Sequence, residues 1–459
     1  MRFVVLGLLL AGCASTPPPI DASRLPEVPA SFKEGDGRWT VAPPAEAQPR
    51  GEWWRAFADP VLDELIERAG RGNTGIQVAA ARLTQARAFA RATDADRSLQ
   101  AGVGASANRL RGIVGGSSGP ARSLFAARAD LSYEVDLFGR LSQASAAAGL
   151  DVQAREGLLQ SARLLVQAEV AQTYLTLRAL DVERALVRGT VGAYRGTLEL
   201  TEQRLRAGDV AELDVARART EVAATESDAF ALDRRRAELE HALAVLVGEV
   251  PSSFAMEAAE WRTALPVIPA GVPGTVLTRR PDVSAAQNTL LAAQARVGVA
   301  KAAWFPRVAL TASGGYVSPE LSDLFESASR AGALGVLAAL PLLDGGRREA
   351  GLQGASAELE AALASYREQI LVAFQDVEDQ LAALRLLAEQ AAAQGRAVES
   401  ASRSTALSDV RYRNGYVSQL DLLDAQRSEL RNRREALQVR SAQYQATVGL
   451  VRALGGGWD

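Results

Sequence analysis

Cysteine and histidine each occur only once in the 459 residues of the sequence, as Cys13 and His241. A single cysteine excludes an intrachain disulfide and a cysteine-based zinc site, and a single histidine excludes a metal site built from several histidines. Aromatic residues make up only 5% of the chain, which is low for an ordinary globular core and suits thin layers of Ala and Leu. Lys and Arg (51) nearly balance Asp and Glu (54), whereas a nucleic-acid-binding protein shows a clustered basic excess. After the first dozen residues, no apolar run reaches the length of a membrane-spanning helix.

The first residues have the form of a targeting segment. A short apolar run ends in Leu10-Ala11-Gly12-Cys13, and small residues before a lone cysteine resemble the signal of bacterial lipoproteins. This predicts that residues 1–12 are removed and that Cys13 carries lipid; the alternative is an ordinary secretory signal with a chance cysteine. Because Ala14 and not Asp follows the cysteine, the resemblance favours the outer membrane. We expect residues 13–50, which are rich in Pro, Ser and Ala, to form an extended segment.

The rest of the chain contains one unit twice. The segments Arg204–Ala218 and Arg411–Ala425 share seven of fifteen residues at an offset of 207 residues. An offset this long indicates duplication of a domain-sized unit and not a solenoid repeat of about 20–50 residues. We predict that each repeat holds a helix, two strands and two long helices. The predicted segments are a first repeat at 51–250, a linker at 251–280 and a second repeat at 281–459.

Two segments in each repeat alternate between apolar and polar residues. In Ala127–Leu137 every odd position is apolar and every even position is polar, mostly charged, and Arg307–Tyr316 alternates in the same way. The segments Ala101–Asn108 and Ala333–Leu342 alternate less cleanly. This pattern predicts strands with one apolar and one polar face, as in a membrane barrel that has lipid outside and water inside. The alternative is a pair of amphipathic hairpins on a soluble core.

Long helical segments follow the strands in each repeat. Residues 140–206 contain no proline and only five glycines, and at about 1.5 Å per residue such a helix reaches roughly 100 Å. Apolar residues step by three or four in both repeats, as in Leu159–Leu180 and Leu363–Leu384. This stripe predicts coiled-coil packing of long helical hairpins.

The fold class that these patterns predict is mainly helical with a membrane β part. Four strands in one chain are too few to close a barrel, and open sheet edges are excluded from lipid because each unpaired backbone group costs several kcal/mol. Closure therefore requires association, and three chains give twelve strands, an even number within the range of bacterial outer-membrane barrels. We expect the coiled-coil hairpins to continue from this trimeric barrel as a periplasmic tunnel.

Several short motifs, in order along the chain, resemble those of the TolC-like outer-membrane efflux factors, in the lipoprotein branch of the OprM and NodT type. The motifs are Trp53–Pro60 (WWRAFADP), Tyr133–Arg140 (YEVDLFGR), Arg280–Asp282 (RPD), Ala300–Pro306 (AKAAWFP) and Asp344–Arg347 (DGGR). The resemblance implies a homotrimeric channel-tunnel in outer-membrane lipid. It implies two partners, a periplasmic adaptor protein and an inner-membrane pump of the RND type. No nucleic acid and no cofactor are expected, and nothing in the sequence resembles a catalytic constellation.

The two turns between the long helices are the candidate functional regions. Gly208 and Gly415 are expected to end the preceding helices in the left-handed conformation. Asp421 and Asp424 follow the second turn, three residues apart, and therefore share one helix face. The alternative is a purely structural role, since the helix dipole favours acids in a first helical turn. The resemblance implies that acids at these two positions ring the periplasmic mouth of the channel, where they attract cations and repel one another.

In the resembled family, a tyrosine on one arm, an arginine beside it and an acid on the neighbouring arm hold this mouth closed. By that resemblance Tyr412 matches the tyrosine and Asp214 matches the acid, whereas Val417 occupies the position of the arginine. Arg411 and Arg413 are the nearby arginines that could substitute for it. The resemblance therefore implies a periplasmic gate that lacks the family's arginine.

The predicted function is a passive exit duct, the outer-membrane component of a tripartite efflux system for drugs or other small molecules. One alternative is an outer-membrane duct for type I protein secretion, which shares the fold. Another is a structural lipoprotein with a coiled-coil stalk. The sequence leaves open the substrate, the pump and adaptor, and the resting state of the gate, because the pump selects most of what such a duct carries.

Overall fold

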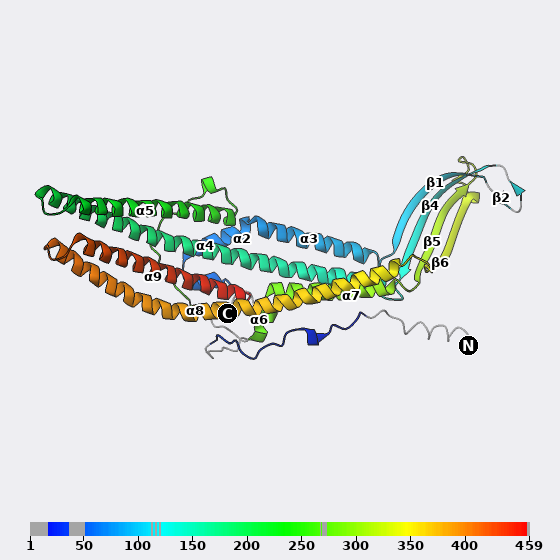
Figure 1. The fold of residues 1–459 in the computed structure, drawn as a ribbon. Helices are drawn as coiled ribbons and strands as arrows, with labels where there is room; N and C mark the ends of the chain where they lie inside the picture. The colour runs from blue at the N-terminus through cyan, green and yellow to red at the C-terminus, as the bar shows by residue number, and fades with distance from the viewer. Residues whose placement is uncertain are drawn as a thin grey trace. The chain divides into compact units, whose positions relative to one another are not determined.

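The computed structural model describes residues 17–35, 51–111, 113–114, 117–118, 121–266, 268 and 273–456. Cys13 and the predicted signal segment lie outside these residues. The elements, labelled in Figure 1, are η1 (Ala22–Arg24), η3 (Trp53–Phe57), α2 (Pro60–Gly72), α3 (Thr74–Ala95), β1 (Gln100–Leu110), β2 (Ile113–Val114), β3 (Ser117–Ser118), β4 (Arg122–Val135), α4 (Arg140–Ala207), α5 (Glu212–Val247), η4 (Pro251–Ser253), α6 (Pro273–Arg279), α7 (Pro281–Ala302), β5 (Arg307–Ser318), η5 (Ser327–Ser329), β6 (Arg330–Ala339), α8 (Arg347–Arg413) and α9 (Gln419–Ala453). The predicted mainly helical class with four principal strands is confirmed. None of the described helices is both long enough and apolar enough to cross a membrane.

The chain forms two compact units, and each unit takes segments from both sequence repeats. Unit 1 contains the described residues up to Pro26 together with Ala81–Gly157 and Ala285–Glu368. Unit 2 contains Glu27–Ala80, Leu158–Ser284 and Gln369–Asp459. All four principal strands belong to unit 1, and both turns between the long helices belong to unit 2.

The four principal strands of unit 1 form one antiparallel sheet in the order β1-β4-β5-β6 (Figure 1). The register places apolar residues opposite apolar residues: Leu131 pairs with Ala101 and Ala312, and Leu310 pairs with Val336. One face of the sheet is therefore apolar from β1 to β6. Its side chains are exposed, as the values of 90% for Val103 and 89% for Leu334 show.

The opposite face of the sheet is polar on β1, β4 and β5. Asp130 lies opposite Gly102 and Ser313 in this face. On β6 the corresponding positions are small, such as Ala333 and Gly335, or apolar, as Leu337 is. This composition explains why the alternation in the sequence is weaker at β6, because small residues mark neither face clearly.

The first helical segment is not continuous, although its sequence pattern predicts one helix from Pro60 to about Leu99. It breaks at Asn73, which is extended (φ −65°, ψ 124°) and separates α2 from α3. The Asn73 amide donates to the Leu246 carbonyl at 2.9 Å, and its side-chain oxygen accepts from the Ile76 N–H at 3.2 Å. A contact with a segment distant in sequence therefore fixes the break.

The second repeat breaks at the equivalent position. Arg280 lies between α6 and α7, 207 residues after Asn73. In each repeat a left-handed glycine that follows the last helix packs against this region: Gly248 (φ 80°) against Gly72, and Gly455 (φ 91°) against the backbone at the end of α6. A Cβ on Gly248 would lie 2.2 Å from the Gly72 carbonyl oxygen, which only glycine avoids. The duplication seen in the sequence thus includes matching backbone contacts.

In unit 2 the long helices form two antiparallel hairpins, α4 with α5 and α8 with α9 (Figure 1). The apolar stripe predicted for α4 is buried at Val166, Val170 and Leu177. Polar side chains bond across each hairpin: Arg184 of α4 to Asp233 of α5 at 2.7 Å, and Ser402 of α8 to Glu429 of α9 at 2.9 Å. These hairpins carry the predicted gate residues.

Candidate functional site

The two turns have the same backbone geometry. Gly208 and Gly415 are left-handed, with φ of 82° and 78°. After each glycine the next N–H bonds back across the end of the helix, from Asp209 to the Arg204 carbonyl at 2.9 Å and from Tyr416 to the Arg411 carbonyl at 2.8 Å. These bonds satisfy carbonyls that a helix end otherwise leaves free. The following helices, α5 and α9, begin at Glu212 and Gln419.

Asp421 is engaged by its own helix terminus. Its carboxylate accepts from the Ser418 N–H at 3.0 Å and from the Ser418 hydroxyl at 2.6 Å, while the Ser418 oxygen accepts from the Asp421 N–H at 3.3 Å. This is a complete capping box, with reciprocal bonds that satisfy free N–H groups. The bonds from Ser418 hold the pKa of the Asp421 carboxyl below its usual value, and the charge of Arg411 acts in the same direction. Asp421 therefore fixes the start of α9.

Asp424 has a different environment, although it lies one turn further along the same face. Its side chain is 63% exposed, and one carboxylate oxygen lies 3.2 Å from an Nη atom of Arg427. The second terminal nitrogen of Arg427 pairs with Glu221 on α5, and this bond holds the pKa of the Arg427 guanidinium above its usual value. Arg427 therefore connects an exposed acid on α9 to the other hairpin.

Tyr412 and Asp214, the other two predicted gate residues, have separate partners. The Tyr412 side chain is 2% exposed, and its hydroxyl lies 3.2 Å from the hydroxyl of Thr201 on α4. Asp214 lies in the first turn of α5, where Arg217 approaches its carboxylate to 3.7 Å. The Tyr412 hydroxyl thus reaches the other hairpin through Thr201.

Arg204 supplies a second bond at this point. Its guanidinium lies over the Tyr412 ring, 4.6 Å from the centroid, and donates to the carbonyls of Tyr412 and Arg413 at 3.2 and 3.3 Å. A cation over an aromatic face is attracted by the ring quadrupole, by about 0.5–1 kcal/mol where the pair is exposed and more where it is desolvated. Of the two arginines suggested as substitutes at Val417, Arg413 pairs with Asp409 on its own helix at 3.0 Å. At Tyr412, the arginine that reaches from the other hairpin is Arg204.

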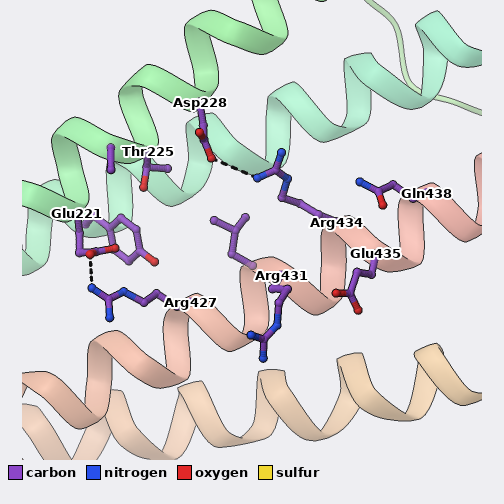
Figure 2. A pocket seen from close by; sticks show the side chains of 11 residues that line it. Glu221, Thr225, Asp228, Arg427, Arg431, Arg434, Glu435 and Gln438 are labelled. Carbon is purple, nitrogen blue, oxygen red and sulfur yellow. Dashed lines mark hydrogen bonds and ion pairs between the residues drawn. The ribbon is translucent and has the colours of Figure 1, made fainter.

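A cavity of about 430 Å³ lies between α5 and α9, further from the two turns than these contacts (Figure 2). Figure 2 shows Glu221 and Asp228 on one side of the cavity and Arg427 and Arg434 on the other. One ion pair joins Arg427 to Glu221 and a second joins Arg434 to Asp228. Tyr194 also lines the cavity, and burial raises the pKa of its hydroxyl to about 12, so that it remains protonated at neutral pH. The walls are therefore polar and charged on both sides.

Three of the residues that join the hairpins, Thr201, Arg204 and Glu221, were not identified from the sequence. No local pattern marks them, since each bonds to a residue more than two hundred positions away. The spacing of Asp424 and Arg427 at i, i+3 on one helix is the signal that could have identified that pair. No group of acidic, histidine or cysteine side chains able to hold a metal ion occurs within the described part of the chain.

Comparison with known proteins gives relatives along nearly the whole chain. The sequence is 35% identical to the pyoverdine export outer membrane protein OpmQ of Pseudomonas putida, covering 99% of this chain and 96% of the relative. It is 33% identical to the solvent efflux pump outer membrane protein SrpC of the same species, covering 98% and 97%.

Solved structures agree with these relatives. The outer-membrane channel OprN superposes with a TM-score of 0.88 at 31% identity, over 97% of this chain and 100% of that one. The outer membrane protein VceC of Vibrio cholerae gives a TM-score of 0.83 at 29% identity, over 89% and 99%. The sequence profile of one family, outer membrane efflux protein, matches twice, at residues 65–249 and 272–456, in agreement with the duplication. The chain therefore belongs to the outer membrane efflux protein family.

Proposed function

We propose that three copies of this chain form a gated exit duct for small molecules across the outer membrane. The observation that carries the proposal is the sheet of unit 1, whose apolar side chains are in register on one face. Within the described chain, the edge strands β1 and β6 each have one neighbour in this sheet. Lipid excludes open edges, so each edge needs a strand from another copy. Three copies supply twelve strands, with the apolar face toward lipid.

The substrate class follows from the relatives, which are a pyoverdine exporter and a component of a solvent pump. In this proposal the duct carries small organic molecules and has no catalytic role. An inner-membrane pump of the RND type supplies the energy, and a periplasmic adaptor protein joins the pump to the helical hairpins. Lipid on Cys13 anchors the start of the chain in the outer membrane.

The gate in this proposal lies at the turns of the hairpins. Asp424 and Asp421 from three copies surround the periplasmic mouth, and their mutual repulsion opposes closure. Tyr412 holds the end of α8 against α4, and Asp214 supplies a further acid at the other turn. Opening is a shift of population from joined to separated hairpins, driven by whatever binds the separated state more tightly.

The decisive experiment is conductance of the purified protein in planar bilayers, together with chemical cross-linking in membranes. We expect a cross-linked trimer and small, cation-sensitive currents. Because Asp421→Ala/Asp424→Ala removes the repulsion that opposes closure, we expect it to give smaller currents with less cation sensitivity. Cross-linking that yields only monomers, or a purified oligomer that never conducts, would reject the duct. Currents that the double substitution leaves unchanged in size and cation sensitivity would reject this gate but not the duct.

The substrate class is tested separately in cells. A deletion strain is expected to accumulate small organic dyes, antibiotics or solvents, and the cloned gene is expected to reverse this. A strain that accumulates none of them but fails to secrete a protein would favour the protein-secretion duct instead.

A further inference from the structure

Cavities interrupt the packing between the two hairpins of unit 2. One of about 430 Å³ lies between α5 and α9, and another of about 400 Å³ lies among α4, α8 and α9. Tyr194 and Leu430 line both, and the buried Tyr194 hydroxyl has no hydrogen-bond partner among the described residues. Protein interiors are normally close-packed. At this level Leu430 of α9 packs against the apolar cluster of Leu180, Val187 and Leu232, and polar side chains cross the remaining gap between the hairpins.

Arg434 crosses the gap to both helices of the other hairpin. Its Nε donates to Glu183 on α4 at 2.7 Å, and an Nη atom lies 3.2 Å from a carboxylate oxygen of Asp228 on α5 (Figure 2). The Glu183 side chain is only 13% exposed. Separation of the hairpins removes the arginine from a largely sheltered carboxylate, which is unfavourable because a charge taken out of water needs its partner.

Arg427 crosses the same gap closer to the turn. Its guanidinium pairs with Glu221 on α5, and the Glu221 side chain is only 15% exposed. A second nitrogen of the same guanidinium lies 3.2 Å from Asp424 on its own helix. One side chain thus makes one bond that must break when the hairpins separate and one bond that need not break.

We propose that Arg427 and Arg434 are positioning residues that hold the two hairpins of each chain in the closed state, and that Arg427 couples this contact to the charge of the gate acid Asp424. The inference rests on the proposed function as a gated duct. While Glu221 orients Arg427, the guanidinium offsets the negative charge of Asp424, which lowers the repulsion that opposes closure. When the hairpins separate, Arg427 loses Glu221 and with it the fixed orientation.

The two halves of this proposal predict different electrical signatures. Glu221→Gln removes the ion pair between hairpins and the carboxylate that orients Arg427, but it keeps the positive charge near Asp424. The channel is therefore expected to open more often, with a smaller rise in cation preference than in Arg427→Gln. Arg427→Gln removes both effects, so it is expected to open more often and to prefer cations more strongly. Arg434→Gln is expected to raise opening without changing the preference, because Arg434 has no recorded contact with either gate acid.

Arg431 offers a matched control for these substitutions. It lies on α9 between the two positioning residues and lines the same cavity, and no ion pair of Arg431 is recorded among the described residues. Its side chain points away from Glu221 and Asp228 in Figure 2. Arg431→Gln therefore removes the same charge from the same helix and is expected to leave opening unchanged.

The test is single-channel recording of the assembled, purified protein in planar bilayers, with thermal unfolding to confirm that each variant folds. We expect Arg427→Gln and Arg434→Gln to shift the equilibrium of each chain toward opening by about fivefold, as for a contact at the upper end of the partly exposed range. Equal effects from Arg431→Gln, or no effect from either positioning residue, would overturn the proposal. An unchanged cation-to-anion current ratio in Arg427→Gln would overturn the coupling to Asp424. If neither the unsubstituted protein nor any of these variants gives a current, the proposed duct itself fails, and the inference fails with it.

Discussion

Removal of one hydroxyl group, by Tyr412→Phe, measures how strongly the ends of the two hairpins are joined. The hydroxyl lies 3.2 Å from the Thr201 hydroxyl, and both side chains are buried, at 2% and 0% exposure. The substitution leaves the aromatic ring in place beneath Arg204. Thr201 is not left without a partner, because its hydroxyl also donates to the Thr197 carbonyl at 2.8 Å. The change therefore removes one hydrogen bond and little else.

The expected magnitude follows from this geometry. A hydrogen bond between neutral groups contributes about 1 kcal/mol net, and no desolvation penalty is added here because Thr201 retains an acceptor. A change of about 1 kcal/mol shifts a two-state equilibrium roughly fivefold. If the three chains of the proposed trimer open together, the factors multiply and the open state gains about a hundredfold relative to the closed state.

The assay is open probability in planar bilayers, with Tyr416→Phe as the matched control. Tyr416 lies just past the same turn and is 76% exposed, so its hydroxyl is expected to have no effect on opening. Independent opening of the three chains would give a rise near fivefold instead of a hundredfold, which distinguishes separate from concerted movement. The reasoning is refuted if Tyr412→Phe, still trimeric and with an unchanged melting temperature, opens no more often than Tyr416→Phe.

Three further predictions concern the stability of the hairpins and their ends. The bonds from Ser418 lower the pKa of the Asp421 carboxyl, so ionised Asp421 stabilises the start of α9 at pH values above the ordinary pKa of 3.8. This stabilisation is lost as the pH falls through the lowered pKa. Hydrogen exchange at the start of α9 should therefore become faster in acid in the native chain but not in Asp421→Asn. Tyr194→Phe removes a buried hydroxyl without a described partner, so thermal unfolding should show stability unchanged or raised by up to about 1 kcal/mol, and a clear loss would contradict this. Gly248→Ala and Gly455→Ala each place a Cβ against backbone at positive φ, so each should lower the unfolding free energy by more than about 1 kcal/mol, whereas the exposed-helix control Gly351→Ala should not.

The sequence pattern predicted the strands well because apolar and polar residues alternate along each strand, and this alternation can be read without knowing the neighbouring strands. The odd residues of β4 were expected on one face, and the register indeed extends that face from Ala101 through Leu131 to Ala312. The break at Asn73 could not be predicted in the same way. Gly72 and Asn73 are residues that often end helices, so a local signal was present but was outweighed by the surrounding helical pattern. The extended conformation is supported by a bond from the Asn73 side chain to the Leu246 carbonyl, 173 residues away.

The same distinction applies to the candidate site. The left-handed turns at Gly208 and Gly415 follow from residue type, because glycine has no Cβ to oppose positive φ. The partner of Tyr412 does not follow from residue type, since Thr201 is one of many small polar residues on a long helix and lies 211 positions earlier. Contacts between hairpins depend on how the helices pack, which the periodicity of each helix alone does not specify.

The duplication shows how one repeat acquired a charge pattern that the other lacks. The equivalent of Asp421 in the first repeat is Asp214, but the equivalent of Asp424 is Arg217, which pairs back with Asp214. The first turn of α5 therefore neutralises its own acid. In α9 the second position is acidic and the arginine lies three residues further on, at Arg427, where it reaches Glu221 on the other hairpin. An exchange of charge at one position and a shift of the arginine by one turn convert a self-contained helix start into one whose exposed acid shares its arginine with the other hairpin.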